Sequence, residues 1–118
     1  MENKKCRVFY DINEMMCCGD PFSVSDLIIW TVIDAKNIRA DYFDFSTVDY
    51  YCENHSSYQP LFSIQGKVES ISIFYQKNQS MKNKLIAVNH APRFVSKEDD
   101  MEAYGFIVEL SNFVVKPC

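Results

Sequence analysis

The stretch from Leu61 to Gln76 constrains the fold of this chain most, because it reads as one long strand with a change of phase. Its apolar side chains occupy even positions at first and odd positions later: Phe62, Ile64 and Val68, then Ile71 and Ile73. Side chains alternate strictly along a flat strand, so the two groups would face opposite sides. A bulge at Glu69 and Ser70 would return them to one face and bend the strand. We therefore predict a bent strand whose apolar side chains share one core with Trp30.

Shorter strands are indicated by runs of β-branched and aromatic residues between turn-forming residues. These runs cover residues 6–10, 22–33, 85–88, 104–110 and 113–115. Together with the long strand they give five or six strands, and the chain has only 3 glycines and 4 prolines. This pattern favours a mainly β fold with one short helix, a small SH3-like or OB-like antiparallel barrel.

The one predicted helix runs from about Thr47 to Asn54. Ser46 precedes it as a cap, and Asp49 stands three residues later, where a carboxylate can reach back to the first turn. Three side chains at helical spacing would then share one face: Val48, Tyr51 and Cys52. At about two turns, such a helix depends on packing against the sheet.

Length and composition indicate a single domain, residues 1–118. The chain is 47% hydrophobic and 14% aromatic, which is ample for one core. Its net charge of −4 argues against a general nucleic-acid coat, because such proteins neutralise phosphates with lysine and arginine. No apolar run reaches the length of a signal peptide or a membrane span, so we expect a cytoplasmic protein.

The 5 cysteines are an odd set in a chain without a secretory signal, which favours thiols over disulfides. The one candidate metal site combines four residues that would suit zinc: Cys17, Cys18, Cys52 and His55. Adjacent cysteines in an extended chain point to opposite faces, so this pair would serve one ion only from a tight turn. Packed or solvent-exposed thiols are the favoured alternative, with Cys6 as a buried small hydrophobe and no resident cofactor.

Residues 17–26 read Cys-Cys-Gly-Asp-Pro-Phe-Ser-Val-Ser-Asp and lead into a strand that carries Trp30. Gly19 and Pro21 predict a turn, because glycine tolerates positive φ and proline fixes its own φ. The run resembles the opening of a family of short, functionally uncharacterised bacterial proteins, with Ser25 where their pattern has glycine. Residues 53–55, 65–71 and 104–110 also resemble that family. The resemblance implies a compact bacterial domain and brings no activity.

Catalytic motifs do not stand out in this sequence. A cysteine nucleophile needs a base nearby, and the only histidines are His55 and His90. The sequence has no glycine-rich phosphate loop, no Gly-x-Ser-x-Gly elbow and no His-Glu-x-x-His motif. We therefore expect a protein that is not an enzyme.

Single-stranded nucleic acid is an alternative ligand. Phe74 and Tyr75 stand among four lysines, and an OB-like face could stack bases on such aromatic rings: Lys67, Lys77, Lys82 and Lys84. A core strand beside a solvated hairpin explains the same residues, and the acidic total favours that second interpretation.

The middle of the chain is rich in tyrosine, a residue enriched at protein interfaces. Four of these tyrosines are candidate partner-binding residues: Tyr42, Tyr50, Tyr51 and Tyr58. Small size, negative charge and the missing catalytic motifs point the same way. The leading hypothesis is a non-enzymatic binding module for a protein partner, of the kind in which a small acidic inhibitor or immunity protein covers a basic site.

Overall fold

A computed structural model describes residues 5–38, 43–52, 60–77 and 82–118. The elements are β1 (Lys5–Asp11), α1 (Ile12–Cys18), β2 (Phe22–Ser23), β3 (Leu27–Asp34), η1 (Ala35–Asn37), η2 (Phe45–Thr47), β4 (Tyr50–Cys52), β5 (Phe62–Gln76), β6 (Asn83–Val88), β7 (His90–Ala91) and β8 (Glu102–Pro117). Strands dominate, so the predicted mainly β class is confirmed.

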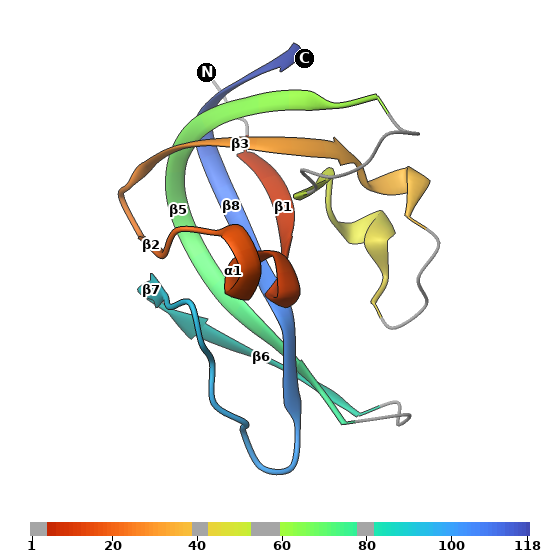
Figure 1. Ribbon diagram of the computed structural model, residues 1–118, viewed down its shortest axis with the longest axis vertical. Helices are drawn as coiled ribbons and strands as arrows, with labels where there is room; N and C mark the ends of the chain where they lie inside the picture. The colour runs from red at the N-terminus through yellow and green to blue at the C-terminus, as the bar shows by residue number, and fades with distance from the viewer. Residues whose placement is uncertain (1–4, 39–42, 53–59, 78–81) are drawn as a thin grey trace.

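Five strands close into a ring in the order β3, β4, β1, β8, β5, because β3 also pairs with β5. β6 lies outside the ring on β5, and β2 pairs separately with β7. The long strands β5 and β8 run side by side and curve across the whole molecule (Figure 1). β1 and β4 pair in parallel, so the prediction of a purely antiparallel sheet is wrong at this pair.

The bulge predicted in β5 is present. The register of β5 against β8 shifts between Val68 and Ser70, with further shifts near Gly66 and Phe74. Polar side chains bridge the two strands near the shift between Val68 and Ser70: Ser70 Oγ donates to Glu109 at 2.8 Å and Ser111 Oγ donates to Glu69 at 2.6 Å. The residues on both sides of the bulge lie in one buried cluster, against which Phe62 and Trp30 pack: Ile64, Val68, Ile71 and Ile73.

A second, smaller cluster lies on the other side of β1. It is built around Phe9 and joins η1 and η2 to the sheet: Ala35, Phe45, Val48, Phe74 and Ile107 are its other buried members. Phe43 and Phe45 pack on Phe9, with ring centroids at 4.8 and 5.2 Å. The molecule therefore has two apolar clusters, one on each face of β1.

The helix predicted over 47–54 is wrong where the structure describes it. Thr47 ends the 3₁₀ turn η2, whose cap is Asp44 rather than Ser46, and 50–52 form strand β4 between β1 and β3. Residues 53 and 54 lie outside the described ranges. Three residues that pair with two strands gain more from the sheet than a two-turn helix gains from its own hydrogen bonds.

The α-helix lies instead at Ile12–Cys18, directly after β1. Asp11 caps it, because its carboxylate accepts a hydrogen bond from Asn13 N at 2.7 Å. Met15 is fully buried, and α1 lies against β1 and β8 (Figure 1). The helix therefore ends on the adjacent cysteines.

The strand predicted over 22–33 is two strands separated by a turn. Asp26 N donates to Ser23 O at 3.1 Å across this turn, and Ser25 has φ 82°. A positive φ at the third residue of a four-residue turn is the requirement of type II turns. The predicted interruption at 111–112 is absent, because β8 continues to Pro117 with Asn112 at φ 49°.

Candidate functional site

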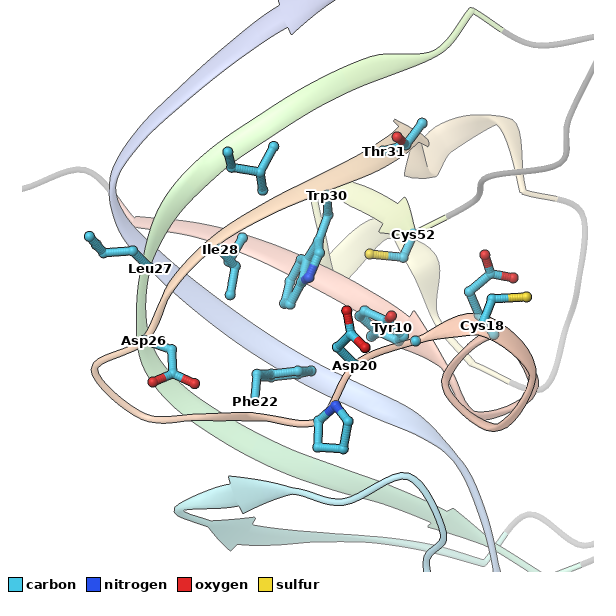
Figure 2. Close-up of a pocket in the computed structure, with 14 residues that line it drawn as sticks. Tyr10, Cys18, Asp20, Phe22, Asp26, Leu27, Ile28, Trp30, Thr31 and Cys52 are labelled. Carbon is cyan, nitrogen blue, oxygen red and sulfur yellow. The ribbon is translucent and has the colours of Figure 1, made fainter.

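The candidate site is a pocket of about 430 Å³ beside the end of α1. Its lining comes from Tyr10 of β1, Glu14 and Cys18 of α1, residues 19–22, the start of β3 and Cys52 of β4. Figure 2 shows Tyr10, Asp20, Phe22 and Trp30 gathered around the same space. Segments far apart in the sequence thus build one concave surface of the size that ligand sites occupy.

Gly19 brings the chain into the pocket by its small size. A Cβ at this position would collide with the Tyr10 hydroxyl and lie 2.9 Å from the Met15 Cα. Its φ is −81°, so the predicted use of glycine for positive φ is wrong. The absence of a side chain lets residues 19–22 run against Tyr10, which places Asp20 at the pocket.

Three aromatic rings form one wall of the pocket. Trp30 meets Tyr10 at a centroid distance of 5.0 Å and Phe22 at 4.9 Å, both edge to face, and Tyr10 and Phe22 are 5.7 Å apart. Such edge contacts are favoured geometries for aromatic pairs. The three rings therefore support one another, and half-buried Trp30 presents part of its surface to the pocket.

Tyr10 is the buried polar group of this wall, with only 6% of its surface exposed. Burial raises the pKa of its hydroxyl first of all, and negative charge near Cys52, Glu14, Asp20 and Cys18 raises it further. The hydroxyl therefore stays protonated at neutral pH. Its oxygen is not among the fully buried side-chain atoms of the described residues that lack a hydrogen-bond partner.

The sequence-predicted zinc ligands are only partly brought together. Cys18 and Cys52 line the pocket, whereas Cys17 is exposed beside Cys18 and does not line it. A hydrogen bond with Cys17 raises the pKa of Cys18. His55 lies outside the described residues, and within those residues no three histidine, cysteine or acidic side chains are placed to hold a metal ion. The zinc site stays a prediction.

Cys6 is buried, as predicted for a packed thiol. Burial first, and then Asp49 through its charge and a hydrogen bond, raise the pKa of Cys6 to about 12. This thiol stays protonated at neutral pH, which suits packing and not metal binding.

The two described tyrosines of the predicted partner surface face different clusters. Tyr51 donates a hydrogen bond to Asp11 at 2.7 Å and stacks on Phe9 at 5.8 Å, whereas Tyr50 contacts Phe62 at 6.3 Å. Both are half-buried in β4. Tyr42 and Tyr58 lie outside the described residues. The four tyrosines stay a prediction.

Phe74 and Tyr75 are only 4% and 5% exposed, so the interpretation of this stretch as a core strand is confirmed. Buried rings cannot stack on bases, which leaves the nucleic-acid alternative without the two rings that it needed. His90 forms part of β7 and lies 2.7 Å from Ser23 Oγ through Nδ1, in a hydrogen bond that joins β7 to β2.

Apolar side chains are exposed on the outer face of the ring. Leu27 and Ile29 alternate on β3 and are 82% and 68% exposed. Ile29 pairs with Gln65, which pairs with Val114 of β8, itself 51% exposed. Directly paired residues share a face, so the three exposed apolar side chains lie on one face, with Gln65 of β5 between Ile29 and Val114. We term these three residues the β3 strip: Leu27, Ile29 and Val114.

Sequence reasoning missed most of this site. Gly19 and Pro21 predict the turn between the cysteine pair and β3, and this signal marks the neighbourhood of Asp20. The local sequence does not mark Tyr10 as a site residue, because only the packing of β1 against residues 19–22 brings its hydroxyl to the pocket. Leu27 and Ile29 were predicted to be in a strand, but nothing local showed which face would be left open.

The fold and the site define a small, mainly β protein with a ring of strands and an aromatic pocket beside its short helix. Residues 4–112 match the family described as a family of unknown function (DUF6578), and the chain belongs to this family. Searches of curated proteins and of solved structures found no match. Among the described residues, no helix is both long and apolar enough to cross a membrane.

Proposed function

We propose that this protein is a non-enzymatic binding module whose ligand is another protein, docked on the β3 strip. The single observation that carries the proposal is the exposure of Leu27 and Ile29, because adjoining apolar side chains on an otherwise soluble surface mark interaction sites. Both residues also line the pocket, although their side chains alternate with those of Ile28 and Trp30 and so project from the other face of β3. A partner on the strip that also reaches around β3 would cover the pocket mouth as well.

Charge indicates the chemistry of this partner. The chain carries a net charge of −4, and the pocket lining includes Glu14, Asp20 and Asp26 and no basic residue among those described. A basic surface complements that field and is steered towards it. An acidic inhibitor or immunity-type protein acting in the cytoplasm fits this arrangement. The closed ring of strands supports, as part of the same proposal, a small SH3-like or OB-like barrel.

The test compares baits that differ at one exposed position. Wild-type protein, Ile29→Asp and Leu85→Asp would be used to capture partners from native cell extract at low and high salt. Leu85 is a matched control, because it is 53% exposed on β6, which pairs with the opposite end of β5 from β3.

The proposal expects one basic protein to bind wild type and Leu85→Asp, to be lost with Ile29→Asp, and to be released by salt. Equal recovery on all three baits would contradict it, and so would the absence of any captured protein at either salt concentration. Melting curves show whether both variants stay folded, which we expect because substitutions at exposed positions usually change stability little.

A structural zinc domain is the second candidate, favoured by the shared position of Cys18 and Cys52 in the pocket lining. His55 follows Cys52 by three residues and would complete the set with Cys17. Metal binding would then supply folding energy. Elemental analysis after purification without added metal should find about one zinc per chain, and chelator should lower the melting temperature. Metal-free protein with unchanged melting in chelator rejects this candidate.

A further inference from the structure

The pocket lining includes a polar group beside its aromatic rings. Tyr10 is 6% exposed as a residue and lines the pocket, and its oxygen is not one of the fully buried side-chain atoms of the described residues that lack a hydrogen-bond partner. A tyrosine hydroxyl at a pocket wall can both donate a hydrogen bond to a bound group and accept one from it. The hydroxyl is placed where a group entering the pocket would meet it (Figure 2).

An uncompensated negative charge stands beside this hydroxyl. Asp20 lines the pocket, is exposed, and forms no ion pair within the described residues. It lies close enough to Tyr10 to raise the pKa of the hydroxyl, as does Glu14. Arg93 is a nearby positive charge, since it lowers the pKa of Cys18 after the Cys17 hydrogen bond and burial have raised it, but Arg93 does not itself line the pocket.

The remaining wall is aromatic and rigid. Trp30 is packed edge to face by Tyr10 and Phe22, which holds its indole in place at the pocket that Glu14, Asp20 and Asp26 also line. Cations are attracted to the faces of aromatic rings, and most strongly to tryptophan. Aromatic surface, a hydroxyl oxygen and carboxylate oxygens together match a flat or compact organic cation better than they match an anion or a neutral group.

We propose that this pocket receives the cationic end of an arginine or lysine side chain from the protein partner. The inference rests on the proposed function, because it names the group with which a partner on the β3 strip would fill the neighbouring pocket. The cation would lie against Trp30 and donate hydrogen bonds to the Asp20 carboxylate and the Tyr10 oxygen. Arginine suits the site best, since its planar group both stacks and donates several hydrogen bonds.

The test uses the fluorescence of Trp30, the only tryptophan of the chain. The protein, residues 1–118, would be titrated with N-acetylarginine methylamide, with the lysine analogue, and with N-acetylcitrulline methylamide as a neutral probe of the same shape. We expect a saturable change with both cations, stronger for arginine, and none with citrulline. An equal response to citrulline, or no saturable change with arginine, would overturn the proposal.

Substitutions locate the binding. Asp20→Asn should weaken arginine binding by about tenfold, because a charge-assisted hydrogen bond contributes on that order. Tyr10→Phe should weaken it less, since the hydroxyl oxygen accepts one hydrogen bond from the cation but carries no charge of its own. Asp100→Asn is the matched control, because Asp100 is an exposed carboxylate outside the pocket lining. Equal weakening by Asp20→Asn and Asp100→Asn would mean general charge attraction and would overturn the pocket assignment.

This result is separable from that of the bait experiment. A partner that depends on Ile29 but binds Asp20→Asn and Tyr10→Phe as tightly as wild type would uphold the β3 strip and reject the cation pocket. Arginine binding that depends on Asp20, found in a chain that captures no partner, would uphold the pocket's chemistry and reject the proposed function.

Discussion

At Ser25 a single residue carries backbone strain. Its φ of 82° lies in the left-handed region, which glycine adopts more readily than serine does. We expect Ser25→Gly to raise the free energy of unfolding by about 0.5–1 kcal/mol, because glycine relieves more strain than it adds in chain entropy. Denaturant melts measure this difference.

The matched control is Ser96→Gly, because Ser96 is also an exposed serine and is not among the positive-φ residues. That change should leave stability unchanged or lower it slightly, since only the entropic cost of glycine applies. Equal effects of the two substitutions would show that the turn at Ser25 is not strained.

Gly19 is a second residue at which one atom decides the packing. A methyl group there would collide with the Tyr10 hydroxyl and crowd the Met15 backbone, so Gly19→Ala should cost about 1–3 kcal/mol. Tyr10→Phe removes the hydroxyl, and the double variant should therefore lose less than the sum of the two single losses. Denaturant melts of wild type, the two single variants and the double variant give the four free energies of unfolding. If the two single losses simply add in the double variant, the Tyr10 hydroxyl is not what the added methyl group collides with.

Among the elements, the bent strand β5 is the best test of the fold. Ile64 and Ile71 stand on opposite sides of the bulge and are 0% and 1% exposed in the same cluster. Truncating either one to alanine should cost about 2–5 kcal/mol, whereas Val114→Ala on the outer face should stay within about 0.5 kcal/mol. A large loss at Ile64 beside a negligible one at Ile71 in denaturant melts would contradict the bulge.

The strands were predictable where a long local pattern existed, and the helix was not. The phase change in β5 pointed to the bulge because periodicity alone requires it. Asp11 and Glu14 have the spacing of a helix cap and its first-turn acid, the same signal that was assigned to Ser46 and Asp49. Local signals could not rank the two sites. Residues 50–52 form strand β4 because they pair with β1 and β3, and the helix forms at α1, where Met15 is buried in the core.

For the whole molecule, closure of the ring decides the site, and closure is not a local property. The pairing of β3 with β5 joins strands from distant parts of the sequence, and the parallel pairing of β1 with β4 depends on β4 lying between β1 and β3. Composition gave the class and the charge, but the pocket exists only because these pairings place Tyr10, Asp20 and Trp30 together. For the same reason the exposed face of β3 could not be read from its alternating sequence.

The five cysteines differ in solvent exposure, and the rate at which each thiol is alkylated measures that difference. Cys17, Cys18 and Cys118 are exposed, whereas Cys6 and Cys52 are buried. Alkylation of the native protein, followed by mass mapping, should modify the three exposed thiols first. Cys6 should react only on unfolding, because burial holds its pKa near 12 and the thiolate is the reactive form.

The same map separates the two candidate functions. A binding module without metal should show equal reactivity of Cys17 and Cys18 with and without chelator, whereas a zinc domain would protect both until chelator removes the ion. Cys118 is the internal control, because it is exposed at the last residue and stands outside the predicted zinc set. Fast alkylation of Cys6 in the folded protein would contradict its place in the core.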